Sequence, residues 1–125
     1  MTRSALPDRR VAVTVRVVWN DGGPDHHLTI TFGFDGTANN PGHLKEAFVA
    51  SFRAEGGIVA LANDACILYS RCLQHGDGVQ ELANTMVENR KDGETTGAPA
   101  SMMGAIARKA VEVQNDVNRR QRSND

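Results

Sequence analysis

The two cysteines are the first residues to consider for chemistry, because a thiolate can act as a nucleophile or as a metal ligand. Cys66 and Cys72 are the only cysteines of the 125 residues, and they stand six positions apart within one predicted helix. Six helical residues rise by about 9 Å, whereas the Cα atoms of a disulfide lie roughly 4.4–6.8 Å apart. The spacing therefore excludes a disulfide between them. It predicts thiols that pack as small apolar side chains in a reducing compartment, the cytoplasm.

Histidines and carboxylates are the second source of chemistry, through metal binding or acid–base catalysis. The chain has four histidines, His26, His27, His43 and His75. None of them stands at the spacing of a zinc finger or ribbon, and no two carboxylates suggest a catalytic pair. We therefore expect no catalytic residue, no metal site and no cofactor. The alternative is a small metal-dependent enzyme that uses His43, His75 and Glu46, which metal analysis of the purified chain would test.

A stripe of polar side chains is the third candidate site. Asn63, Ser70 and Gln74 fall within about 40° of one another on the predicted helix. The stripe is either a solvated face or a hydrogen-bonding seam against another element or a partner, and such seams specify docking geometry. Together with Glu46, these are the residues that we predict to bind a partner or a ligand. On this interpretation, alanine at position 63 or 74 weakens association and leaves the fold intact.

Arginines near the C-terminus raise the question of nucleic-acid binding. Arg119, Arg120 and Arg122 form a local basic cluster, but Asp116 and Asp125 flank it. The net charge of the chain is −1, so no global field attracts nucleic acid. We expect a solvated helix end at this cluster. Weak nucleic-acid binding through the arginines is the alternative, and a steep salt dependence of binding would support it.

The composition limits what can position these residues. A chain of 125 residues is enough for one domain, and 40% apolar content with only 5% aromatic residues predicts a core of aliphatic side chains. No apolar run approaches the roughly 20 residues that span a bilayer, and the polar start of the chain predicts no secretory signal. We expect a single domain over residues 10–118, a flexible arm at 1–9 and a polar tail at 119–125.

Strands are predicted first along the chain. Apolar and polar residues alternate over residues 10–19 and again over residues 28–34, and turn residues at 20–24 separate the two runs. The short turn predicts an antiparallel hairpin. Residues 43–52 are ambiguous, and we prefer a third strand to a helical turn there.

The clearest helix is predicted over residues 58–75, with Gly76 ending it. Its apolar arc covers more than half of the circumference, which is typical of a helix that is central or half-buried by a partner. We therefore expect this helix to mediate homo-oligomerisation or docking to another protein.

Two further helices are expected after it. Asp77 caps the second one, with Gln80 in a capping box, and the helix runs to a polar loop at residues 91–98. The last helix begins at Pro99 or Ser101. Strands followed by helices predict an α+β fold, in which an antiparallel sheet of two or three strands carries about three helices on one face.

Three stretches occur in a distinctive order. They are Leu6-Pro7-Asp8-Arg9-Arg10, Leu44-Lys45-Glu46-Ala47-Phe48, and the segment from Asn63 to Gly76 with its Ser70 and Leu73-Gln74. Together they resemble the C-terminal region of adenosylcobalamin-dependent ribonucleotide reductases, the so-called TSCPD domain. That region has a Leu-Pro-x-Arg-Arg lead-in, strands that end in a Gly-Glu-x-Phe-type segment, a long apolar helix closing on Leu-Gln-x-Gly, a short capped helix and a final helix. The resemblance covers most of residues 6–115.

The chain also departs from this family. The Thr-Ser-Cys-Pro-Asp motif and a Cys-x-x-Cys tail are absent, and Val59 stands where the family pattern has an arginine. The reductase reaction needs a large barrel with a cobalamin radical, a thiyl cysteine and a reducing cysteine pair, so no catalytic residue carries over. The resemblance implies a free-standing accessory or regulatory module of deoxyribonucleotide metabolism. It would act by protein association or by binding a small ligand such as a nucleotide, with a ribonucleotide reductase catalytic chain as a partner.

Overall fold

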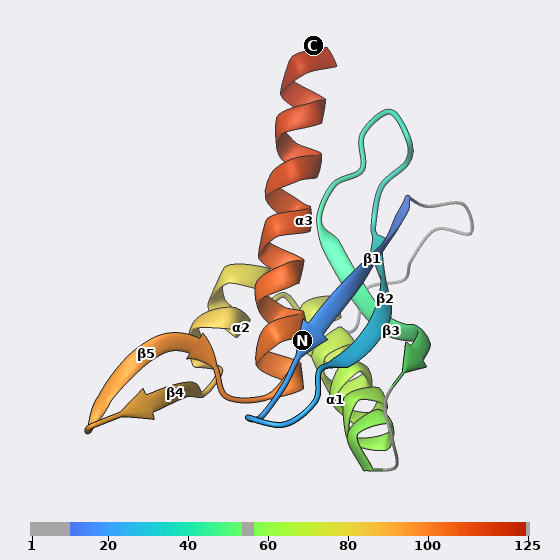
Figure 1. The fold of residues 1–125 in the computed structure, drawn as a ribbon. Helices are drawn as coiled ribbons and strands as arrows, with labels where there is room; N and C mark the ends of the chain where they lie inside the picture. The colour runs from blue at the N-terminus through green and yellow to red at the C-terminus, as the bar shows by residue number, and fades with distance from the viewer. Residues whose placement is uncertain (1–10, 54–56, 125) are drawn as a thin grey trace.

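The computed structural model describes residues 11–53 and 57–124, which form an α+β fold (Figure 1). An antiparallel sheet comes first, helices follow it, and a β-hairpin lies between the second and third helices. The elements are β1 (Ala12–Trp19), β2 (His26–Phe34), β3 (Leu44–Arg53), α1 (Gly57–Gln74), α2 (Val79–Thr85), β4 (Glu88–Lys91), β5 (Glu94–Pro99) and α3 (Met102–Asn124). The predicted fold class is confirmed. The arm predicted at residues 1–9 lies outside the described residues.

The main sheet has the order β1-β2-β3, and both neighbouring pairs are antiparallel. Alternate residues of a strand point to the same side. On the central strand β2 these are Leu28, Ile30, Phe32 and Phe34, and all four are fully buried. Helices α1 and α3 pack on this side and complete one core with it, so the helices cover a single face of the sheet.

Strand β3 is an edge strand of this sheet, and the third strand expected at residues 43–52 is confirmed. The loop before it has a defined shape, because the Asp35 carboxylate accepts a hydrogen bond from the His43 N–H at 2.8 Å. Residue 36 must be glycine, since a Cβ there would overlap the backbone oxygen of Asn40. The loop therefore fixes where β3 begins.

Helix α1 ends at Gln74, and the predicted glycine, Gly76, forms its C-terminal cap. Gly76 has a φ of 114°, a conformation that other residues rarely adopt. The next N–H, from Asp77, donates to the Cys72 C=O at 3.1 Å, as in a Schellman motif. This cap directs the chain away from the axis of α1 and into α2.

Helix α3 is the longest element. Ser101 caps it, because its Oγ accepts a hydrogen bond from the Gly104 N–H at 3.0 Å. Buried residues along its first half, such as Ile106 and Ala110, pack into the core. The helix continues to Asn124, so residues beyond 118, predicted as a polar tail, extend it (Figure 1). No helix in the described part of the chain is long and apolar enough to cross a membrane.

The segment between α1 and α3 differs from the prediction. Strands β4 and β5 form a hairpin where the end of a longer helix and a polar loop were expected. Asp92 and Gly93 have φ values of 54° and 83°, and this dipeptide favours two-residue hairpin turns. Val79, Leu82, Ala83, Met86 and Val87 follow a helical spacing, which favoured the longer helix. Val87 is 70% exposed, so this spacing does not mark a buried face at its end.

The cap of α2 also differs from the prediction. Gly78 precedes the helix, and its N–H donates to the Glu81 carboxylate at 3.2 Å. The predicted capping box, Asp77 with Gln80, is therefore wrong by one residue. The turn at Gly76 extends through Asp77, so the helix begins one position later and Gly78 and Glu81 take these places.

Candidate functional site

One face of α1 lies against the outer edge of β3 and carries part of the predicted polar stripe. The Ser70 hydroxyl accepts a hydrogen bond from the Ala47 N–H at 2.9 Å and donates to the Ala47 C=O at 3.1 Å. One turn later, the Gln74 amide donates to the Lys45 C=O at 3.1 Å. The Lys45 ammonium donates in return to the Leu73 C=O at 3.1 Å. At these two positions the stripe is a hydrogen-bonding seam within the chain.

A second amide extends this seam to the start of β3. Gln114 of α3 is buried, and its Oε1 accepts a hydrogen bond from the Leu44 N–H at 2.7 Å. Its Nε2 donates to the Gly42 C=O and to the Asn118 side chain, both at 3.1 Å. The sequence prediction missed Gln114. The available signal was an amide placed within the apolar stripe of the last helix.

Ser70, Gln74 and Gln114 form the β3 edge seam, in which side chains make hydrogen bonds to backbone groups at the outer edge of β3. Outward N–H and C=O groups without partners are a template for pairing with another chain. Buried backbone groups also cost free energy when they are not paired. Side chains of α1 and α3 supply these partners, so the seam holds both helices on the sheet and covers this part of the edge.

The other two predicted residues lie away from the seam. Asn63 is exposed on the first half of α1. Glu46 is half-buried on β3, where it is opposite Gly33 of β2. Because strand side chains alternate, Glu46 points to the sheet face opposite that of the buried Ala47. The structure thus brings Ser70 and Gln74 together and leaves Asn63 and Glu46 apart from them.

Both cysteines are free, and Cys66 is part of the core. Cys66 is buried, and this burial raises the pKa of its thiol to about 11. A thiol with such a pKa stays protonated at neutral pH and is a poor nucleophile. Cys72 is half-buried about 1.7 turns further along α1. Cys66, the more deeply buried of the two, therefore acts as an apolar side chain.

Tyr69 is buried near Cys66, and its hydroxyl has no hydrogen-bond partner among the described residues. Burial and the nearby thiol raise the pKa of this phenol above its usual range. A buried hydroxyl without a partner costs about 1–3 kcal/mol. We expect Tyr69→Phe to raise the free energy of unfolding by about 1 kcal/mol in urea denaturation. A clear loss of stability would instead mean that the hydroxyl is satisfied in the folded protein.

The residues of the alternative metal site do not converge. Within the described ranges, no group of three or more His, Cys, Asp or Glu side chains is placed to hold a metal ion. His43 is exposed and borders a groove of about 420 Å³ between the start of β3 and residues 76–81. His75 and Glu46 do not line this groove.

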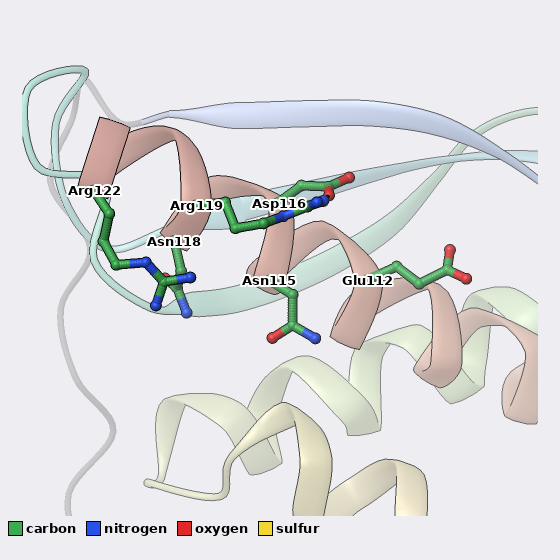
Figure 2. Close-up of a pocket in the computed structure, with 6 residues that line it drawn as sticks. All are labelled: Glu112, Asn115, Asp116, Asn118, Arg119 and Arg122. Atoms are coloured by element: carbon green, nitrogen blue, oxygen red, sulfur yellow. Dashed lines mark hydrogen bonds and ion pairs between the residues drawn. The ribbon is translucent and has the colours of Figure 1, made fainter. Parts of the chain in front are cut away.

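The basic end of α3 has mixed charge. A groove of about 540 Å³ along this helix is lined by Glu112, Asn115, Asp116, Asn118, Arg119 and Arg122 (Figure 2). Arg119 forms an ion pair with Asp116 of the same helix. Acidic side chains therefore share this groove with the arginines, and such mixed charge does not favour binding of a phosphate backbone.

The side of α1 that faces away from the sheet is apolar and exposed. Leu61, Ile67 and Leu68 are 68%, 59% and 65% exposed, and they are three of the six exposed large apolar residues in the described part of the chain. Asp64 and Arg71 are also exposed and lie on the same side of the helix. These five residues are referred to below as the α1 outer face. Large apolar side chains gathered in this way mark an interaction surface more often than scattered ones do.

An apolar pocket of about 120 Å³ borders the α1 outer face. It is lined by Trp19, Ile58, Leu61, Ala62, Ala65, Ala100, Ser101, Met102 and Met103. The indole of Trp19 is held in place, because its Nε1 donates to the Pro99 C=O at 3.1 Å and its ring stacks on His26. The pocket extends the apolar surface from α1 onto the start of α3.

Comparison of the chain with family models, curated proteins and solved structures finds no match. Function is therefore inferred from the described surfaces, since one fold class hosts many functions. The β3 edge seam is satisfied within the chain, and the α3 groove has mixed charge. The α1 outer face exposes apolar side chains and is the best candidate site.

Proposed function

We propose that this chain is a non-catalytic module that acts by protein association through the α1 outer face. The observation that carries the proposal is the exposure of Leu61, Ile67 and Leu68 on one side of a helix whose other side is buried. Large apolar side chains exposed together on one face are characteristic of protein–protein contact sites. The polar residues on the inner side of α1, Ser70 and Gln74, hold the fold and leave recognition to the outer side.

Burial of the α1 outer face against a partner would lower the free energy of the complex. Fully burying one leucine or isoleucine side chain is favourable by about 1.5–3 kcal/mol, and these three side chains are roughly two-thirds exposed. Covering all three would therefore contribute about 3–6 kcal/mol on this side of the interface. This contribution drives association but does not select a partner, because apolar burial is non-directional.

We also propose that the module works with ribonucleotide reductase in deoxyribonucleotide metabolism in the cytoplasm. The support is the order of the three sequence stretches together with the order of the elements. Strands precede a long helix that is capped at Gly76, a short helix and a final long helix, in the order that the family region has, and the β4–β5 hairpin before the final helix is an addition to that order. In this proposal the partner is a reductase catalytic chain, and the module carries no reductase chemistry of its own.

The double variant Leu61→Lys/Leu68→Lys tests the association surface. Because both side chains are mostly exposed, the variant is expected to fold but to lose association. Size exclusion with light scattering at high protein concentration should give a mass above the monomer for the wild type and the monomer mass for the variant. Val87→Lys is the matched control, since Val87 is equally exposed but lies outside the α1 outer face.

Retention on an immobilised reductase catalytic chain tests the named partner. The wild type and Val87→Lys are expected to be retained, and the double variant is expected to pass through. A wild-type chain that is monomeric and is not retained would contradict the proposal. Far-UV circular dichroism of each variant shows that the fold is intact.

A further inference from the structure

We infer that the α1 outer face binds a second copy of this chain, with the two α1 helices antiparallel about a two-fold axis. The inference rests on the proposed function, because it takes association through this face as given. It adds a second copy as one partner and gives its orientation. This second copy and a reductase chain would occupy the face in turn. The observation that carries it is the charge pattern of the face, which is complementary to itself in one orientation.

Two opposite charges lie on the face at a defined spacing. Asp64 and Arg71 are seven positions apart, so they are separated by about 10 Å along the helix axis and by only about 20° around it. Both are exposed, and neither forms an ion pair with another described residue. The two charges are therefore available to groups on a partner.

An antiparallel arrangement converts this pattern into two ion pairs. The two residues are equally far from the point between Ile67 and Leu68. A two-fold axis through that point, perpendicular to α1, brings Asp64 of each copy level with Arg71 of the other. The contact is isologous, so one complementary pair is always made twice. Guanidinium–carboxylate pairs of this kind fix orientation across an interface.

A parallel arrangement is disfavoured by the same two residues. A two-fold axis along the helices would place Asp64 against Asp64 and Arg71 against Arg71. Like charges facing each other across an interface cost free energy, and this cost discriminates against the wrong orientation.

Apolar residues on both sides of the charges complete the contact. By the helix angle, Leu61 and Leu68 lie on one side of the charged pair and Ile67 lies on the other. The antiparallel axis keeps each side opposite the same side of the second copy. Each Leu68 then meets the Leu68 of the second copy near the axis. Leu61 lies about 10 Å from the axis along the helix, beside the apolar pocket next to Trp19.

Charge reversal tests this orientation in the full chain. Asp64→Arg and Arg71→Asp each place like charges across the axis, and each is expected to raise the dissociation constant of the dimer at least about tenfold. The double variant D64R/R71D restores opposite charges at the same places and should return the constant to within about threefold of the wild type. Sedimentation equilibrium over a concentration series measures these constants. Emission of Trp19, the only tryptophan of the chain, reports whether the neighbouring pocket is covered.

Glu94→Arg is the matched control, because Glu94 is an exposed acid on β5 whose reversal should leave the dimer unchanged.

Rescue in the double variant supports the inference. If single and double reversals all dimerise like the wild type, the antiparallel pairing is overturned, while loss of the dimer in Leu61→Lys/Leu68→Lys still supports the proposed function. If the singles weaken the dimer and the double does not restore it, the inference also fails. A monomeric wild type that still binds a reductase chain through the leucines overturns the inference and leaves the proposed function standing.

Discussion

Replacement of Gln114 by alanine is expected to lower the free energy of unfolding by about 2–4 kcal/mol. The side chain is buried on α3 and joins this helix to the start of β3 through the Leu44 N–H and the Gly42 C=O. Alanine leaves both backbone groups without this partner and also leaves a small cavity. The loss should appear as a lower urea midpoint at an unchanged slope. All samples need the same protein concentration, because association itself stabilises the folded state.

Asn115→Ala is the matched control for this experiment, since it removes an exposed amide from the next position of α3. We expect it to change the free energy of unfolding by no more than about 0.5 kcal/mol. Gln114→Glu adds a finer test, because it keeps an oxygen for the Leu44 N–H but loses the donor to the Gly42 C=O. Equal urea midpoints for the alanine variants at 114 and 115 would mean that Gln114 does not hold β3.

Gln74→Ala is expected to destabilise the fold by about 2–3 kcal/mol. The amide is 2% exposed and donates to the Lys45 C=O on the outer edge of β3. Its removal leaves an outward backbone group of an edge strand without this donor. The sequence pattern alone suggested that this variant would weaken association and leave the fold intact. The structure changes the expectation, because the side chain is enclosed between α1 and β3.

Asn63→Ala gives the comparison, since Asn63 belongs to the same polar stripe but is exposed. Its urea midpoint should match that of the wild type. Any effect of this variant on association stays a prediction, and light scattering measures it alongside Gln74→Ala. A Gln74→Ala chain of unchanged stability and lost association would show that Gln74 acts in recognition, against the role that its hydrogen bond indicates.

Elements with a strong period were predictable from the sequence. Alternation over residues 10–19 and 28–34 indicated β1 and β2, and the wide apolar pattern over 58–75 indicated α1. These signals depend on residue type and local spacing, which act before any tertiary contact forms. The prediction failed between α1 and α3, where helical spacing competed with a hairpin turn signal. The turn at Asp92 and Gly93 prevailed, because their positive φ values cannot continue a helix.

Local pattern also indicated that the main sheet precedes the helices, and that the two cysteines form no disulfide with each other. The core is aliphatic only in part, because Phe32 and Phe34 are its largest fully buried side chains and Tyr69 belongs to it. It could not show which polar groups meet, since Gln114 and Leu44 are 70 positions apart. An amide finds such a partner only when packing of helices on the sheet brings the backbone group to it. In the same way, the wide apolar arc of α1 indicated a surface for a partner. Which apolar side chains stay exposed is decided by the packing of α1 along β3. A helix buries only one side against a sheet, so Leu61, Ile67 and Leu68 on the other side remain in solvent.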